Sequence, residues 1–477
     1  MAEPCDLTAL EARSLIGSKG LSPVELLDSC ITRISAFNPI VNAFVATCYD
    51  RARSEAKAAE AAVMSGAALP PLHGLPLGIK DLEITEGLRT TFGSQLFAGN
   101  VPSHDESLIA SIRRAGAIVI GKTNTPEFGA GAHTTNAVYG HTRNPFDTKR
   151  ISGGSSGGSA VALACGMVPI ATGSDLGGSV RTPAAYCGVV GFRPSVGVVP
   201  SELRPIGWMA FPTRGPMGRT VADAQLLLRA MVGYDVRDPM SFPCDETQFQ
   251  NSLECDLSSL KVAITEDLGF APVDNGIRKV FNAAVARFQH VFREAQRVDP
   301  PLQGADEIFE PLRALDHVAV HEEKCAKTPD KVGPNVTANV KQGLAMSLAD
   351  VAHAAAGATE LYRGFVRFMN DFDVLITPAA SVPPFPVEQL YLDKINGKPL
   401  RTYFHWIAIT YGLTLTAHPV IVIPCGLDHT GTPFGIQLCG RRGQDQRLLR
   451  IAATLESYFA GVAELRRPIL DFQKLRA

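Results

Sequence analysis

The pattern of hydrophobic and polar positions in residues 1–66 is that of helices. A capping-box pattern begins at Ser22, and apolar residues follow it at helical spacing. After a short apolar run at 41–45, residues 50–64 are rich in Ala, Glu, Arg and Lys, and Gly66 ends that stretch. The N-terminal segment is therefore predicted to be helical.

From about residue 70 the pattern changes to short apolar runs, which alternate with stretches of helical periodicity. The runs at 75–80 and 117–121 have the length and bounding residues of buried strands, whereas 106–115 and 220–232 have helical spacing. This alternation predicts an α/β fold.

Two segments interrupt this pattern: residues 235–260 are polar and contain Pro239 and Pro243, and residues 300–345 are charged with little periodicity. Strand-like apolar runs return after them. We therefore predict one domain over 1–477. It consists of the helical segment, a core at about 70–235, a peripheral excursion at about 236–345, and a C-terminal part, 346–477, that rejoins the same sheet.

Composition narrows the class of protein. Of the 477 residues, 45% are hydrophobic and 19% are charged, as in a soluble globular protein, and the net charge of −2 gives no electrostatic footprint for nucleic acid. There is no apolar run of a secretory signal, and no stretch has the roughly 18 apolar residues of a membrane span. The ten cysteines are scattered without a C-x-x-C pair. We expect a cytoplasmic protein with reduced thiols, and neither a nucleic-acid nor a membrane partner.

Residues 116–123, GAIVIGKT, match the spacing of a phosphate-binding P-loop. That loop follows a strand and precedes a helix, whereas here a helical stretch precedes the motif and its central residues are themselves strand-like. Thr125 and Pro126 would interrupt any helix after it. Nucleotide binding is therefore disfavoured.

Residues 153–157, GGSSG, match the G-x-S-x-G nucleophile elbow of α/β-hydrolases. An elbow directly follows a hydrophobic strand, but residues 144–150 have the composition of a loop. The pattern argues against that fold, although not against catalytic serines.

The histidines offer no metal or triad signature. Only His317 and His321 have helical i, i+4 spacing, and they lack both the glutamate of H-E-x-x-H and a third ligand. We expect them on an exposed helix face rather than around zinc, and we expect no metal site.

Glycine and serine are concentrated in two short segments, GGSSGGS at 153–159 and GSDLGGS at 173–179. Either segment alone is compatible with a tight turn that packs a helix against a sheet. Together they predict backbone N–H groups and hydroxyls that converge on one small site.

These two segments, with the following R-x-P-A and C-G-V-x-G, resemble the core pattern of the amidase signature family almost residue for residue. HGLPLGIKD at 73–81 is similar to that family's lysine segment. The resemblance covers nearly the whole chain and is weakest at 240–345. It implies the amidase signature fold, in which helices cover both faces of a large central mixed β-sheet.

The resemblance also implies a catalytic triad. Ser179 would be the nucleophile that forms an acyl-enzyme, Ser155 would bridge it to Lys80, and Lys80 would be the general base. Ser156 would support the triad by hydrogen bonding, and a cis peptide bond would join Gly154 to Ser155. No metal and no cofactor are implied.

Such a triad places a chemical demand on Lys80. A serine hydroxyl is a poor nucleophile near neutral pH and needs an adjacent base, so the lysine must be neutral. Leu75, Leu77 and Ile79 give it an apolar setting, which would lower its pKa by desolvation. The alternative is a surface lysine paired with Asp81.

Backbone N–H groups next to the nucleophile would bind the oxyanion of the tetrahedral intermediate. The resemblance assigns this role to Leu176, Gly177 and Gly178, and it places Gly129 at a substrate-contacting position.

The predicted function is hydrolysis of a small-molecule carboxylic amide to an acid and an amine or ammonia. One alternative is the amidase subunit of a tRNA-dependent amidotransferase, which would need a partner chain. The Ser-Ser-Leu-Asp-Gln-like segment usual there is replaced by MAFPT at 209–213, which weakens that interpretation. A second alternative, a catalytically silent binding protein, conflicts with the intact Lys80, Ser155 and Ser179. Whether the chain forms a homodimer stays open.

Trp208, Met209 and Phe211 form an aromatic and apolar cluster before Gly215. They are either ordinary core or the lining of a substrate pocket, since in the amidase signature fold this loop comes near the substrate channel. As a pocket, they would favour an uncharged aryl or medium-chain acyl amide over acetamide or glutamine.

Overall fold

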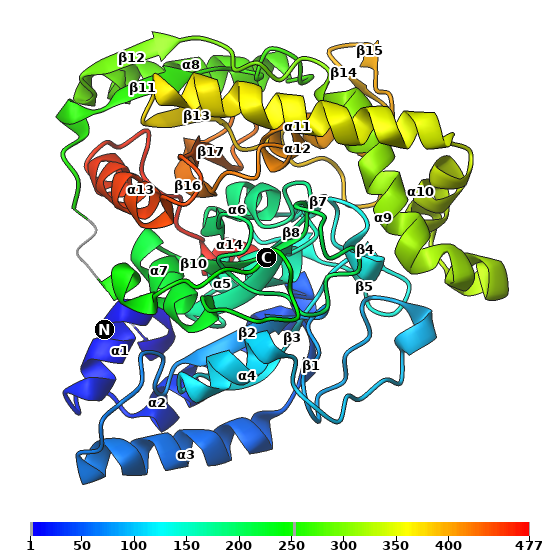
Figure 1. The fold of residues 1–477 in the computed structure, drawn as a ribbon. Coiled ribbons are helices and arrows are strands. Elements are labelled where there is room, and N and C mark those ends of the chain that lie inside the picture. The colour runs from blue at the N-terminus through cyan, green and yellow to red at the C-terminus, as the bar shows by residue number, and fades with distance from the viewer. Residues whose placement is uncertain (1–2, 251–253, 477) are drawn as a thin grey trace.

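The computed structural model describes residues 3–250 and 254–476. A mixed 11-stranded sheet runs through it, and helices cover both faces of the sheet (Figure 1), as the amidase signature resemblance predicts. In spatial order its strands are β1 (Phe44–Thr47), β3 (Ile118–Thr123), β2 (Pro76–Lys80), β8 (Ile170–Asp175), β10 (Thr213–Gly218), β9 (Val190–Arg193), β16 (Val420–Leu427), β17 (Pro433–Cys439), β13 (Val374–Pro378), β11 (Lys261–Ile264) and β12 (Glu294–Arg297).

The α-helices of the described residues are α1 (Ala9–Gly17), α2 (Pro23–Val41), α3 (Tyr49–Ser65), α4 (Ser107–Arg114), α5 (Gly157–Ala164), α6 (Arg181–Cys187), α7 (Val221–Met231), α8 (Asn275–Phe288), α9 (Ala305–Lys327), α10 (Pro334–Leu344), α11 (Leu348–Asn370), α12 (Ala408–Thr414), α13 (Asp445–Ala460) and α14 (Phe472–Arg476). Three small two-stranded pairs accompany the main sheet: β4 (Thr135–Asn136) with β5 (Gly140–His141), β6 (Arg143–Asn144) with β7 (Asp147–Ile151), and β14 (Lys394–Ile395) with β15 (Lys398–Pro399).

The N-terminal helices form where the pattern predicts them. Ser22 and Glu25 make the reciprocal hydrogen bonds of a capping box at the start of α2. Helix α3 ends at Gly66, which has the left-handed conformation (φ 77°) that favours glycine at a helix end. The apolar run between these helices gives β1, which pairs with β3.

Strand β2 lies between β3 and β8 and is parallel to both. Because the carboxyl ends of parallel strands lie at one edge of a sheet, Lys80 at the end of β2 and Asp175 at the end of β8 come to the same edge. The topology therefore brings together two segments that are far apart in the sequence.

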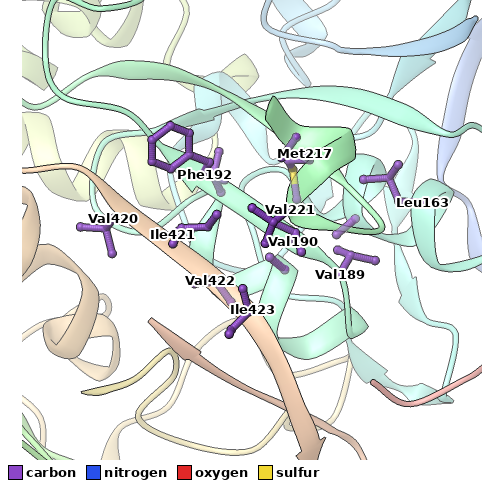
Figure 2. Packing of buried hydrophobic residues seen from close by; sticks show 14 of the residues in the cluster. Leu163, Val189, Val190, Phe192, Met217, Val221, Val420, Ile421, Val422 and Ile423 are labelled. Atoms are coloured by element: carbon purple, nitrogen blue, oxygen red, sulfur yellow. The ribbon is translucent and has the colours of Figure 1, made fainter. Parts of the chain in front are cut away.

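Continuous apolar strands form the core of the central sheet. Side chains at 420–423 on β16 lie beside Val190 and Phe192 on β9, and all of them are fully buried (Figure 2). Met217 on the neighbouring β10 is buried in the same cluster. Burying one such side chain contributes roughly 1.5–3 kcal/mol, so this layer gives the site a rigid support.

Residues 236–345 are less peripheral than expected. Strands β11 and β12 extend one edge of the main sheet through pairing with β13, and the charged stretch at 300–345 folds largely into α9 and α10. Helix α9 packs against α10, α11 and α12, so other helices cover it on several sides. The assignment of 1–477 to one domain stays a prediction.

The P-loop-like motif is a strand with a structural lysine. Its residues from Ile118 form β3, and the buried Lys122 Nζ donates hydrogen bonds to Thr85 Oγ1 at 3.0 Å and to the Glu83 carbonyl oxygen. The lysine is thus held inside the protein, in agreement with the argument against nucleotide binding.

Candidate active site

Lys80, the last residue of β2, is fully buried. Its Nζ donates hydrogen bonds to Ser155 Oγ at 2.7 Å, to Ser156 Oγ at 2.9 Å and to Ser174 Oγ at 2.9 Å. The alternative of a surface lysine paired with Asp81 is therefore wrong, because the lysine nitrogen faces serine hydroxyls rather than solvent.

Burial is the main cause of an unusual pKa at Lys80. It lowers this pKa from 10.5 to about 7; the Glu83 and Asp175 carboxylates oppose the shift, and Arg214 adds to it. Near neutral pH a large fraction of molecules therefore carries a neutral lysine, whose nitrogen lone pair is able to accept a proton.

The two glycine- and serine-rich segments meet beside this lysine, as their pattern predicts. Ser155 and Ser156 lie immediately before α5, and the peptide bond between Gly154 and Ser155 is cis. The Ser156 backbone N–H donates to the Ser179 carbonyl oxygen at 3.0 Å. Ser155 and Ser179 line the same cavity.

A buried ion pair holds the turn that carries Ser179. The Asp175 carboxylate accepts the backbone N–H of Gly178 at 2.9 Å and that of Val180 at 3.1 Å, and it pairs with Arg181 at 3.0 Å. Burial alone would raise the pKa of Asp175, but the guanidinium groups beside it lower that pKa below its usual range. Asp175 is therefore ionised and fixes the turn.

Gly178 is constrained by its surroundings. Its φ of +125° is one that side chains rarely allow, and a Cβ there would lie 2.2 Å from Thr410 Oγ1. Its N–H is bound to the carboxylate described above, so it is not free for the oxyanion role expected of it. Among the described residues, the N–H groups of Leu176, Gly177 and Ser179 have no hydrogen-bond acceptor, and these three are available to an oxyanion.

A cavity of about 240 Å³ adjoins these groups. Ser155, Ser174 and Ser179 line it, and together with the underlying Lys80 we call them the serine–lysine floor. Gly129 also lines it, and a Cβ on Gly129 would lie 3.4 Å from Ser155 Oγ. Apolar side chains supply much of the remaining surface: Leu82, Phe92, Phe128, Leu176, Leu203, Val320, Phe404 and Ile407.

Helix α9 lines the cavity with residues at helical spacing. We call them the α9 wall: Arg313, Asp316, His317, Val320 and His321. The expected exposed face is wrong for His317 and His321, which are only 5% and 6% exposed, because neighbouring helices and the cavity loops cover this side of α9. Burial lowers the pKa of both, that of His321 to about 3, so both rings are neutral at physiological pH.

Trp208, Met209 and Phe211 lie outside the cavity lining, contrary to the pocket expected from the sequence. Trp208 is 79% exposed, whereas Met209 and Phe211 are core residues, and the Phe211 ring stacks on Phe309 at 5.5 Å. Their loop still reaches the cavity, but through Leu203, Pro205 and Pro212.

Three further observations concern residues 3–250 and 254–476. No group of three or more His, Cys, Asp or Glu side chains there is arranged to hold a metal ion. No helix in these ranges is long and apolar enough to cross a membrane. All ten cysteines are free.

Comparison with known proteins identifies the family. The amidase family model matches residues 25–449. The fold superposes on the crystal structure of a bacterial aryl acylamidase of the amidase signature family with a TM-score of 0.88 and 28% identity, covering 94% of this chain and 96% of that one. The chain belongs to the amidase signature family. As an amidase it is a hydrolase that acts on carbon–nitrogen bonds.

Two relatives of this amidase have different roles. An acylamidase from Rhodococcus erythropolis is 34% identical over 458 residues, which are 94% of this chain and 95% of that protein. The A subunit of the glutamyl-tRNA(Gln) amidotransferase of Chloroflexus aggregans is also 34% identical, over 483 residues that cover 94% and 96% of the two chains. Sequence identity alone therefore does not separate a free-standing amidase from an amidotransferase subunit.

Several groups around the site of this amidase were not predicted from the sequence. Ser174 carried a signal, since it lies within the second glycine- and serine-rich segment. Arg214 lines the cavity and lies opposite Ser174 in the register of β10 and β8, which no sequence spacing reveals. The α9 wall had only the spacing of its histidines as a signal.

Proposed function

We propose that this amidase hydrolyses small-molecule carboxylic amides through an acyl-enzyme on Ser179, with Ser155 and Lys80 as its proton relay. One observation carries the proposal. A buried lysine, with a pKa lowered to about 7, lies 2.7 Å from Ser155 Oγ beneath a cavity that Ser179 also lines.

The relay begins with a neutral lysine. The neutral amine has two N–H donors and one lone pair, and three serine hydroxyls surround it. Ser156 and Ser174 accept its two N–H groups, which directs the lone pair toward the hydroxyl of Ser155. Lys80 then takes the Ser155 proton while Ser155 takes the proton of Ser179, and Ser179 Oγ attacks the amide carbonyl carbon.

Backbone N–H groups receive the developing charge. The N–H groups of Leu176, Gly177 and Ser179 bind the oxyanion, and one such donor contributes roughly 3 kcal/mol to the transition state. When the intermediate collapses, the proton held by Lys80 returns through Ser155 to the leaving nitrogen, and the amine departs. Water then attacks the acyl-enzyme by the same relay, which releases the acid and regenerates Ser179.

The cavity supports an aryl or medium-chain acyl group as the preferred body of the substrate. Phe92, Phe128, Phe404 and Ile407 offer it apolar and aromatic surface, as is usual in pockets for neutral ligands. The acylamidase and aryl acylamidase relatives agree with this choice. The A subunit of a tRNA-dependent amidotransferase is the alternative that the second relative supports.

Steady-state kinetics of the purified chain alone test the proposal. The substrates are phenylacetamide, hexanamide, acetamide and glutamine, with the Ser179→Ala variant as a blank. We expect kcat/KM to be at least roughly tenfold higher for the first two than for acetamide, because apolar burial in the cavity stabilises them. Preference for glutamine, or turnover only in the presence of a partner chain, would contradict a free-standing acyl amidase.

A further inference from the structure

Asp316 on the α9 wall is a buried carboxylate that accepts no hydrogen bond from the described residues. Burial raises its pKa to about 6, and the nearby charges of Arg313 and Arg204 oppose that shift. Asp316 lines the cavity and is 9% exposed. Within residues 3–250 and 254–476 it forms no hydrogen bond or ion pair, and its Oδ1 is both inaccessible to solvent and unpartnered. A carboxylate that lines a cavity and receives no hydrogen bond is costly to bury, so it points to a ligand that supplies the missing donor.

Arg313, one helical turn before Asp316, does not donate a hydrogen bond to the Asp316 carboxylate. Arg313 Nε donates to Asn339 Oδ1 at 3.2 Å and Nη2 donates to the Tyr403 hydroxyl at 2.8 Å. The guanidinium group also lies over the Phe404 ring, 4.8 Å from its centroid. These contacts hold the Arg313 guanidinium group toward its own neighbours. No salt bridge joins it to Asp316 in the described part of the chain, although its charge is near enough to lower the pKa of that carboxyl.

The next residue of the wall adds a second acceptor. His317 Nδ1 lies 3.0 Å from the Arg313 carbonyl oxygen, and since a carbonyl only accepts, this nitrogen carries the proton. Burial lowers the pKa of His317 well below its ordinary value, so the ring is neutral. Its Nε2 is therefore an acceptor on the same wall as the Asp316 carboxylate. His321 Nδ1 is likewise buried without a partner.

We propose that Asp316 and His317 are specificity-determining residues that select amides whose apolar body carries a hydrogen-bond donor, with a primary amine as the best fit. An amine supplies several N–H donors for the two acceptors that line this wall, and its ammonium form also balances the carboxylate charge. A hydroxyl supplies one donor, whereas an ionised carboxylate on the substrate supplies none. The inference rests on the proposed amide hydrolysis and names its substrate class.

A matched substrate series tests this assignment with the full-length enzyme at pH 8. The substrates are 4-(aminomethyl)phenylacetamide, 4-(hydroxymethyl)phenylacetamide and 4-ethylphenylacetamide, which differ little in size, and the same series with the substituent at position 3. In the wild type we expect kcat/KM for the better aminomethyl isomer to exceed that for its ethyl counterpart by at least roughly tenfold, with hydroxymethyl between them, because a site built for a donor rejects the analogue that lacks it.

Two variants of α9 complete the test. In Asp316→Asn the aminomethyl-to-ethyl ratio of kcat/KM should fall at least roughly tenfold, since the carboxylate charge is lost without a change of shape. In Glu323→Gln, which removes an exposed carboxylate on the same helix, the ratio should stay at the wild-type value. Asp316→Leu should bring the ratio below one, and it serves where Asp316→Asn fails to fold.

The outcomes separate this inference from the proposed function. Turnover of the ethyl substrate by the wild type with no preference for either donor substrate, or a preference that survives Asp316→Asn and Asp316→Leu, would overturn the role of Asp316 alone. Absence of turnover for the whole series and for unsubstituted phenylacetamide would overturn the proposed function on which it rests.

Discussion

The serine–lysine floor and the α9 wall line the same cavity, but they differ in how far their polar groups are hydrogen-bonded within the protein. On the floor, Lys80 contacts three serine hydroxyls, and the turn of Ser179 is fixed by Asp175 and Arg181. On the wall, the Asp316 carboxylate and His321 Nδ1 have no hydrogen-bond partner among the described residues. Because the polar groups of the floor are hydrogen-bonded to one another, the floor is preorganised for one reaction. The acceptors of the wall lack donors, so a bound substrate must supply them. The difference separates the chemistry of the site from its choice of substrate.

The largest expected effect comes from removing the base of the floor. Lys80→Met keeps the length of the side chain but has no lone pair for the proton of Ser155, so we expect kcat/KM to fall roughly 10³- to 10⁵-fold. Thermal unfolding at pH 6 is the control. Because the variant no longer places in the core an amine that would have to be charged, its Tm should not fall. Retained turnover, or loss of activity only through unfolding, would count against the relay.

A smaller loss is expected when the turn of the floor is displaced. In Gly178→Ala the new methyl group would lie 2.2 Å from Thr410 Oγ1 at a strained φ, so the oxyanion donors beside it must move, and kcat should fall on the order of 100-fold. Gly397→Ala is a matched control, because Gly397 also has positive φ, 77°, but its Cβ would meet nothing within 4 Å. Equal activity of the two variants would show that the turn tolerates displacement.

The pH dependence of kcat/KM measures the pKa of Lys80 in the floor. Lys80 must be deprotonated to act, and its pKa is lowered to about 7, so kcat/KM should be constant above that value and fall as pH drops through it. At pH values well below this pKa, kcat/KM should fall about tenfold per pH unit, as expected for a single essential base. A pH profile with phenylacetamide is sufficient. A decrease of kcat/KM that begins near pH 10, as for an exposed lysine, would contradict the conclusion that burial lowers the pKa of Lys80.

The smallest effect is expected at the cluster that the sequence suggested as a pocket. Trp208 is 79% exposed and lies outside the cavity lining, so Trp208→Ala should leave the ranking of phenylacetamide, hexanamide and acetamide unchanged, with each kcat/KM within about twofold of wild type. A change of rank would mean that the loop closes over the substrate.

The floor was predictable from the sequence because each of its segments carries a local signal and resembles the corresponding segment of the amidase signature family. The glycines and serines of 153–159 and 173–179 are needed where backbone and hydroxyl groups approach one another, and Lys80 ends an apolar strand that is buried along its whole length. The α/β class followed from strand-length apolar runs that alternate with helical periodicity. These features depend on near neighbours in the chain.

The wall was not predictable in the same way, because its environment is supplied by distant segments. His317 and His321 have the spacing of any helix face, and only the packing of α9 against α10 and α11 buries them. The same holds for Trp208, whose aromatic character suggested a pocket while the fold left it exposed. The edge strand β12 was missed because its residues are mostly exposed and polar. Strand β11 was missed although its apolar residues at 262–264 are buried, because the run is only three residues long.

Covalent labelling tests most directly the central claim that the floor makes Ser179 nucleophilic. The purified chain is treated with an aryl or alkyl fluorophosphonate, and intact-mass measurement is followed by peptide mapping. The account predicts a single adduct on Ser179, no adduct in Ser179→Ala, and much slower labelling in Lys80→Met. An adduct on Ser155, or labelling that persists in Ser179→Ala, would contradict it.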